Sequence, residues 1–149
     1  MVQAQNDKPS RSPSLTSIGF LLHRAQSRLR EGVVAAIEGS GLHPGQLAIL
    51  GVLSDKGPLS QRALAEASQI EKSSLVLFLD TLERDGWLYR DDDPEDRRAH
   101  LVKLTPKGKT KFSVLGLRLQ KAQDAFLAPI SKAEHAQLIE LLLRLGGPT

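Results

Sequence analysis

The residues with the clearest chemical potential lie in the polar stretch between positions 91 and 98. This stretch contains five acids, one proline and the adjacent arginines Arg97 and Arg98. Short apolar runs at 87–90 and 100–105 flank it and carry the β-branched and aromatic residues typical of strands. The pattern predicts a β-hairpin whose loop is too long for a tight turn and therefore projects from the protein. Two arginines at the tip of a projecting hairpin suit a polyanion.

An arginine at such a tip can enter the minor groove of DNA, where the potential is most negative. Asp96 lies two residues before Arg98, so it can pair with the guanidinium and reduce the entropy lost on binding. The acids at 91–93 would repel phosphate unless they point away or pair with Arg90 and Arg97. The alternative is an ordinary charged surface loop without a ligand.

A helix predicted over 71–85 must hold a second group of side chains close to this hairpin. Its apolar face, expected to be buried, carries four residues at helical spacing: Leu75, Phe78, Leu79 and Leu82. The opposite face and its flanks carry Lys72, Ser73, Ser74, Val76, Leu77, Asp80, Thr81 and Arg84. Hydroxyls and amides at a helix N-terminus can bind phosphates, and aliphatic side chains can contact thymine methyl groups. The alternative is that Val76 and Leu77 pack against another protein or stay exposed.

The remaining elements follow from apolar periodicity and cap residues. We predict further helices over 14–37, 44–56, 60–67, 107–127 and 131–145, with Ser60 as one N-cap and Ser131 with Glu134 as a capping box. A short helix, a tight turn, a second helix and then a hairpin form a winged helix-turn-helix order. We therefore expect a mainly α fold with a small β-hairpin wing (α+β), in which residues 1–13 are a disordered tail and 14–147 form one domain.

The helix predicted over 107–127 combines an apolar seam with a run of cations. The seam steps by three and four residues: Phe112, Leu115, Leu119, Ala122 and Phe126. Between positions 105 and 123 there are five cations and no acid. Such a run can attract a polyanion, but it can equally be a solvated helix face.

The composition excludes several classes of protein. The 149 residues include no cysteine, so there is no disulfide, thiolate nucleophile or cysteine redox sensor. No run approaches the ~20 apolar residues of a membrane span, and the polar N-terminus lacks an export signal, so we expect a cytoplasmic protein with no membrane partner. The four histidines lack ligand spacing, and no serine has the neighbours of a nucleophile. We therefore expect no metal, no cofactor and no enzymatic activity, while the net charge of +3 is weak evidence for nucleic acid.

Three segments resemble the wing of the MarR family of transcriptional regulators. They are Gly-Trp-Leu-Tyr-Arg at 86–90, Asp-Pro-Glu-Asp-Arg-Arg-Ala at 93–99 and Leu-Val-Lys-Leu-Thr-Pro-Lys-Gly at 101–108. The family's recognition-helix frame is also matched, by Leu75, Leu79, Leu82, Glu83 and Gly86. With the predicted order of helices, the resemblance extends from about residue 14 to 145.

The resemblance implies a homodimer that binds a pseudo-palindromic, double-stranded DNA operator, and we expect a repressor. The helix at 71–85 would enter the major groove and the wing the minor groove. Arg98 would insert, Asp96 would orient it, and Arg97 would contact the backbone or the groove wall. The expected DNA contacts are Ser60, Gln61, Lys72, Ser73, Ser74, Val76, Leu77, Arg84, Asp96, Arg97 and Arg98.

The resemblance also implies dimerisation through helices at about 14–38 and 107–145, flanking a winged helix-turn-helix at about 43–105. The expected interface residues are Ile18, Leu22, Phe112, Leu115, Leu119, Ala122, Phe126, Leu138 and Leu142. Many members respond to small aromatic or phenolic effectors bound between these helices and the DNA-binding lobe, and our effector-site hypothesis names His23, Arg24, His43 and Trp87. The alternative function is a ligand- or protein-binding module that retains the fold without binding an operator.

Overall fold

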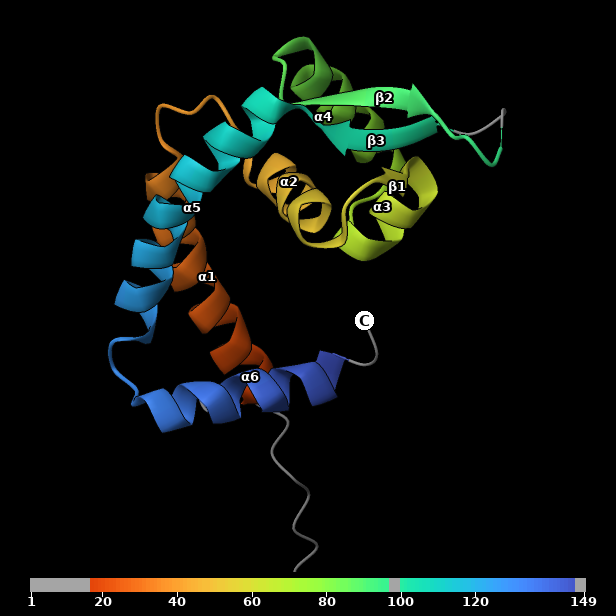
Figure 1. The fold of residues 1–149 in the computed structure, drawn as a ribbon. Coiled ribbons are helices and arrows are strands. Elements are labelled where there is room, and N and C mark those ends of the chain that lie inside the picture. The colour runs from red at the N-terminus through yellow and green to blue at the C-terminus, as the bar shows by residue number, and fades with distance from the viewer. Residues whose placement is uncertain (1–16, 97–99, 147–149) are drawn as a thin grey trace, which may run out of the picture.

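The computed structural model describes residues 17–96 and 100–146. Its elements are α1 (Ile18–Ile37), α2 (Pro44–Lys56), β1 (Leu59–Ser60), α3 (Gln61–Ser68), α4 (Lys72–Arg84), β2 (Leu88–Asp92), β3 (His100–Leu104), α5 (Pro106–Leu127) and α6 (Lys132–Gly146). In Figure 1, α1 and α5 run side by side, a lobe of α2, α3, α4 and the sheet lies at one end, and α6 crosses at the other. The predicted fold class is confirmed, whereas the predicted tail at 1–13 lies outside the described residues.

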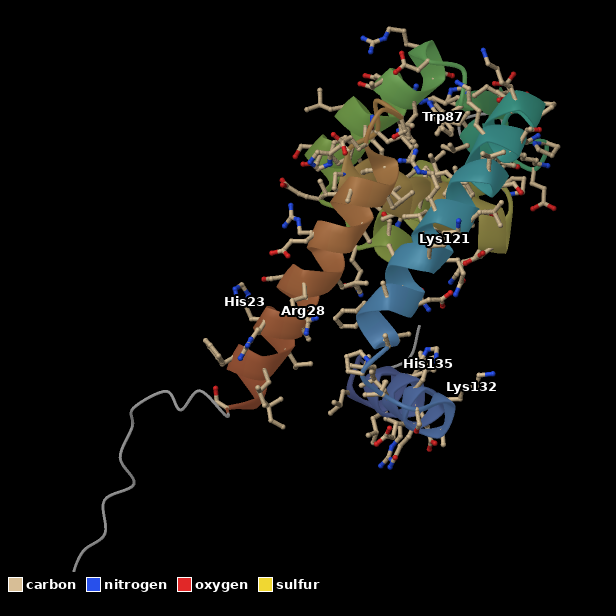
Figure 2. The ribbon with its side chains drawn as sticks, turned by 90° about the vertical axis from the view of Figure 1, so that its left-hand side faces the viewer. His23, Arg28, Trp87, Lys121, Lys132 and His135 are labelled. Carbon is tan, nitrogen blue, oxygen red and sulfur yellow. The ribbon has the colours of Figure 1, made fainter. Side chains whose placement is uncertain are left out.

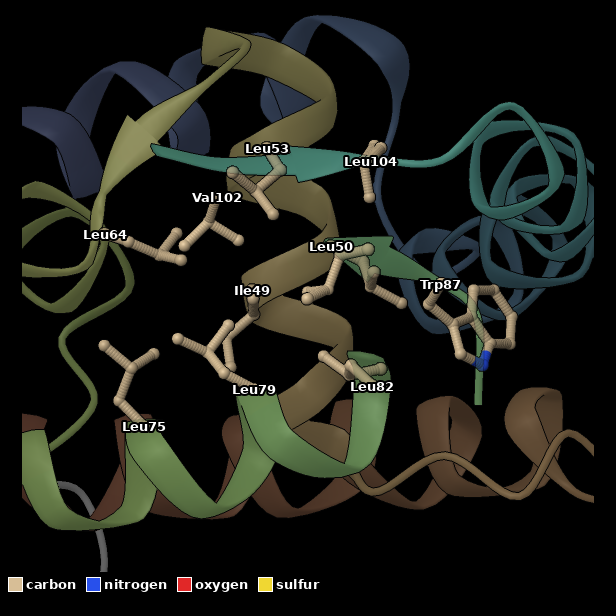
Figure 3. Packing of buried hydrophobic residues seen from close by; sticks show 11 residues of the cluster. Ile49, Leu50, Leu53, Leu64, Leu75, Leu79, Leu82, Trp87, Val102 and Leu104 are labelled. Atoms are coloured by element: carbon tan, nitrogen blue, oxygen red, sulfur yellow. The ribbon is translucent and has the colours of Figure 1, made fainter. Parts of the chain in front are cut away.

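The lobe is organised around the apolar face predicted for α4. Leu75, Leu79 and Leu82 are buried there and belong to one cluster with Ile49 and Leu50 of α2 (Figure 3). The cluster also includes Leu53, Leu64, Trp87, Leu88, Val102 and Leu104. Because each lobe element contributes to this one cluster, α4 and the sheet form a single packed unit.

The predicted cap residues begin two of the helices, α3 and α6. Ser60 Oγ accepts a hydrogen bond from the Ala63 amide at 3.2 Å and begins α3. Glu134 accepts from the Ser131 amide at 2.7 Å, and Ser131 Oγ accepts from Glu134 at 3.3 Å, so the capping box of α6 is confirmed. The predicted start of the first helix at residue 14 was wrong, because α1 begins at Ile18 after the extended N-cap residue Ser17. Several hydroxyl residues occur there, and sequence alone does not choose among them.

The sheet has three antiparallel strands in the order β1-β3-β2, not the two strands of the predicted hairpin. Leu59 and Ser60 form β1 and pair with Val102 and Leu101 of β3. Two residues cannot show strand periodicity, so this strand has no sequence signal of its own. The predicted end of the first hairpin strand, at residue 90, also moves, because β2 continues to Asp92.

The three consecutive aspartates have local partners that the sequence analysis did not identify. Asp91 Oδ2 accepts from Lys103 Nζ at 2.7 Å across the hairpin. The carboxylate of Asp92 lies 3.2 Å from Nδ1 of His100, its cross-strand neighbour. Asp93 accepts from the Glu95 amide at 2.9 Å and shapes the start of the loop. Of the alternatives left open for these acids, pairing with Arg90 does not occur, because the hairpin itself supplies their partners.

The seam on α5 is packed within the chain. Leu115 is buried, and Phe112 lies against the lobe cluster. Farther along, a Cβ on Gly32 of α1 would lie 3.6 Å from Cβ of Ala122, so the two helices approach closely there. By contrast, α6 buries no residue at all. The seam thus joins α5 to α1 and the lobe, while most apolar side chains of α6 stay exposed.

A junction of Gly86, Trp87, Thr105 and Gly108 joins α4, β2, β3 and α5. Gly86, with φ +76°, ends α4 in a Schellman arrangement, in which its amide bonds Glu83 O and the Trp87 amide bonds Leu82 O. Thr105 Oγ1 donates to Gly86 O at 2.7 Å and accepts from the Gly108 amide at 2.8 Å. Trp87 O accepts from the Thr105 amide at 3.1 Å. The threonine hydroxyl therefore links the end of α4 to the beginning of α5.

We predict that Gly108→Ala lowers the free energy of unfolding by ~1–3 kcal/mol or more. The new Cβ would lie 1.9 Å from the carbonyl oxygen of Trp87, a backbone atom that no side-chain rotation can move away. Urea denaturation at one fixed protein concentration measures the effect. Gly116→Ala, in the same helix with no heavy atom within 4 Å, is the matched control and should gain ~0.5–1 kcal/mol. Equal stability of the two variants would contradict the close packing at Gly108.

The Lys103 pair also predicts a pH dependence. The hydrogen bond and the charge of Lys103 lower the pKa of Asp91 below its ordinary value of 3.8. The pair therefore stabilises the hairpin at neutral pH, and this contribution is lost as the pH falls through the lowered pKa in the folded state. We expect Lys103→Met to return the Asp91 pKa toward 3.8, as measured by carboxyl NMR titration, whereas Lys132→Met on α6 should leave it unchanged. An Asp91 pKa that is the same in all three proteins would refute the pairing.

Candidate nucleic-acid interface

The outward face of α4 is a solvent-exposed stripe of four residues one turn apart. Ser73, Leu77, Asp80 and Arg84 form it, and Leu77 is 68% exposed. No side chain caps the N-terminus of this helix, because Glu71 makes no capping hydrogen bond there. The amides of the first turn can therefore bind a phosphate next to Lys72 and Ser73. A helix with hydroxyls at its start and an exposed leucine after them can sit in a major groove.

The predicted contacts on α3 border this face. The Ser60 hydroxyl is occupied as the cap of α3, so only its backbone and its second lone pair remain for DNA. Gln61 and Lys72 line a hollow of about 470 Å³ between α3 and α4, together with Arg62 and Val76. Gln69, with φ +53°, makes the tight turn that sets the two helices against each other. The helix-turn-helix geometry thus brings one arginine, Arg62, and one lysine, Lys72, to the same hollow.

Arg90 ties the recognition helix to the wing. Its Nη2 donates to Asp80 Oδ1 at 2.6 Å, its Nη1 pairs with Glu83 Oε2, and its amide donates to Glu83 Oε1 at 2.9 Å. Burial lowers the pKa of Arg90, but the hydrogen bonds and charges of Asp80 and Glu83 outweigh burial and raise it above its ordinary value. Arg84, one turn after Asp80, pairs with Asp85 at 3.1 Å and not with Asp80.

The tip of the wing lies mostly outside the described residues. Asp96 is exposed, whereas Arg97 and Arg98 fall in the gap between residues 96 and 100. The roles predicted for these three residues therefore stay predictions. The strands that carry the tip are described, and in Figure 1 they project from the lobe beyond α3 and α4.

Two of the four residues named for an effector site have defined structural roles. Trp87 is buried in the lobe cluster, and its ring also lines a pocket of about 670 Å³ between the α1–α2 turn and α5. Lys111 Nζ lies 4.8 Å from the ring centroid, within the range of a cation–π contact. His43 caps α2 by accepting from the Gly45 amide at 3.0 Å and stacks on Phe78. His43 is thus a capping histidine and does not line the Trp87 pocket.

The other two residues, His23 and Arg24, are exposed on the first half of α1. Figure 2 shows His23 far along α1 from Trp87. The described chain therefore does not bring the four residues to one site. The sequence analysis missed Lys107, Lys111 and Arg118, the cations that line the Trp87 pocket, although the acid-free run in α5 was a signal for them. Within residues 17–96 and 100–146, no three metal-ligating side chains cluster.

Known proteins were compared with this chain. The family model for the MarR family matches residues 42–100, which extend from just before the start of α2 to the first residue of β3. A protein of Thauera aromatica, described as a transcriptional regulatory protein for the hcr operon, is 34% identical over 129 residues, covering 86% of this chain and 78% of that protein.

Solved structures agree with this match. A probable transcriptional regulator from Pseudomonas aeruginosa is 32% identical with a TM-score of 0.78, covering 87% of this chain and 97% of that one. The PcaV transcriptional regulator from Streptomyces coelicolor, solved in complex with its natural ligand, is 28% identical with a TM-score of 0.79, covering 92% and 97%. None of the described helices has the length and apolar content needed to cross a membrane. The chain belongs to the MarR family, and it is a DNA-binding transcriptional regulator rather than an enzyme.

Proposed function

We propose that the protein is a cytoplasmic homodimeric repressor that binds a pseudo-palindromic operator and is released by a small effector. The observation that carries the proposal is the exposed stripe of α4 next to a projecting wing. Leu77 is 68% exposed at the centre of the lobe's surface, where a helix that only packed in a core would be covered or charged. If α4 lies in a major groove, the Leu77 side chain can contact the bases at the floor of the groove.

Each residue expected at the interface has a role suited to its chemistry. Lys72, Ser73 and Ser74 bind phosphate at the helix start, and Val76 and Leu77 contact thymine methyl groups. At the wing, Arg98 enters the minor groove, Asp96 orients it, and Arg97 contacts the backbone. Gln61 and Arg84 lie at the two ends of this surface. Ser60 acts mainly by capping α3.

The homodimer is supported by apolar side chains that the single chain leaves uncovered. On α1, Ile18 and Leu22 are exposed, and on α6, Leu142 is exposed while Leu138 is half-buried. Two copies can cover these surfaces mutually, because a symmetric dimer places the same patch on both sides. The seam residues Phe112, Leu115, Leu119, Ala122 and Phe126 contribute by holding α5 against α1 and the lobe rather than by facing the partner alone.

Effector release follows from the geometry of two lobes on one duplex. Two recognition helices match successive major grooves only when they are about 34 Å apart. An effector that favours a different spacing must weaken DNA binding, and DNA must weaken effector binding equally. The pocket beside Trp87 lies between the lobe and α5, and its three cations and apolar walls fit a small aromatic or phenolic anion. His23 and Arg24 are exposed on α1 and do not line this pocket, so they could contact an effector only at a separate site on α1.

Operator binding is tested with a duplex from the protein's own promoter. We expect a dissociation constant near ~10⁻⁸ M or tighter, with affinity falling steeply as salt rises. Arg98→Ala should weaken binding by ~1–3 kcal/mol and reduce the salt slope, because one cation leaves the interface. Arg144→Ala, at the far end of α6, is the matched control and should bind like the parent. Binding that is absent or insensitive to salt would favour the alternative of a protein- or ligand-binding module.

The dimer is tested by placing charge on α6. Leu142→Glu should shift sedimentation from dimer toward monomer, because it forces a carboxylate into an apolar interface. The helical circular dichroism should stay unchanged, since Leu142 is exposed in the single chain. Ala133→Glu places the same charge on the polar side of α6, with Glu140 and Arg144, and should remain dimeric. An intact Leu142→Glu dimer would remove this face from the interface.

A further inference from the structure

We propose that Asp80 reads a cytosine in the major groove of each half-site and that Arg90 is the residue that positions it. This inference rests on the operator binding proposed above and adds a specificity determinant to it. Asp80 is an acid in the middle of the α4 stripe, although this stripe is the surface proposed to face the DNA polyanion. The side chain of Asp80 is 59% exposed there, so burial does not explain it.

The Arg90 contact holds Asp80 in one orientation. Nη2 of Arg90 donates to Oδ1 of Asp80 at 2.6 Å, and the Arg90 side chain is only 21% exposed. The guanidinium therefore lies behind the stripe, between the helix and β2, and does not face the solvent as a phosphate contact would. It fixes the carboxylate from the protein side, which reduces the entropy that Asp80 would lose on binding a base.

The contact is not needed to attach the wing to the helix. Glu83 already accepts from both the amide and Nη1 of Arg90, so the strand and the helix are joined without Asp80. Arg84, the next cation on the stripe, bonds Asp85 instead. What the additional bond to Asp80 accomplishes is the orientation of that carboxylate. Of the two carboxylate oxygens of Asp80, only Oδ1 has a hydrogen-bond partner among the described residues. Oδ2 is therefore available to accept a hydrogen bond from a base in the groove.

An oriented acceptor selects cytosine among the four bases. In the major groove, guanine presents O6 and N7 and thymine presents O4, all of which are acceptors that repel a carboxylate. Adenine has a donor at N6 but an acceptor beside it at N7, whereas cytosine presents its N4 amino group without an adjacent acceptor on the same base. Leu77 lies one turn before Asp80 on the stripe, so an apolar contact to thymine is expected next to the cytosine.

The experiment selects binding sites from a pool of random duplexes with the full-length dimer, and then measures affinity for single-base changes in the selected site. For the parent protein, replacing the cytosine at one position of each half-site should weaken binding roughly 5- to 150-fold. Asp80→Ala should reduce this discrimination to about twofold or less while leaving the preferences at other positions intact. Asp80→Asn should shift the preference toward adenine, because an amide can pair with both N6 and N7. Asp55→Ala, which removes one negative charge from α2, should keep the cytosine preference.

The positioning role of Arg90 has its own readout. Arg90→Gln should lower discrimination at the Asp80 position alone, and Arg90→Lys should restore part of it, whereas general loosening of the wing would lower discrimination at every position. Unchanged cytosine preference in Asp80→Ala overturns the inference while operator binding stands. Equal tightening of Asp80→Ala on all duplexes also overturns it, because Asp80 would then only repel phosphate. A parent protein that selects no sequence overturns the proposed operator binding together with this inference.

Discussion

The hydroxyl of Thr105 is the contact on which the placement of the DNA-binding lobe depends. It donates to the carbonyl of Gly86 at the end of α4 and accepts from the amide of Gly108 in the first turn of α5. The close approach of Gly108 to the Trp87 carbonyl leaves no room for a side chain. α4 and α5 are therefore joined by one short side-chain hydroxyl and by a close approach of backbone atoms, which cannot adjust by changing rotamers. Any change in the direction of α5 must carry the lobe with it.

The lobe itself behaves as one body because apolar and polar contacts act on the same elements. The leucines of α4 belong to the cluster shared with α2, α3 and the strands. On the outer side, Arg90 joins β2 to Asp80 and Glu83 of α4. The wing and the recognition helix thus keep a fixed relation, and the regulation we propose acts by moving whole lobes rather than by deforming one. Such motion needs only a small change where the lobe meets α5 and the partner, since packed units resist internal distortion.

The features that sequence could predict are those determined within one turn of the chain. Ser60, Ser131 with Glu134, and Gly86 each act on amides or carbonyls a few residues away, so their types and spacing were sufficient. The features that were missed join distant positions. Asp80 meets Arg90 across ten residues, and β1 exists only because β3 returns beside it. The α5 seam correctly indicated an apolar partner, but periodicity cannot say whether that partner lies in the same chain.

The internal pairing of acids explains how a lobe with so many carboxylates can bind DNA. Asp91 is matched by Lys103, and Arg90 offsets one of the two negative charges of Asp80 and Glu83. An acid paired at this range contributes little field at the distance of a phosphate, because its partner's charge cancels most of it and salt screens the rest. The five cations of α5 between positions 105 and 123 have no acid among them and contribute their full charge to the local potential. The net charge of +3 is a sum over the whole chain and does not describe the local potential, because the cations of α5 are concentrated on one helix.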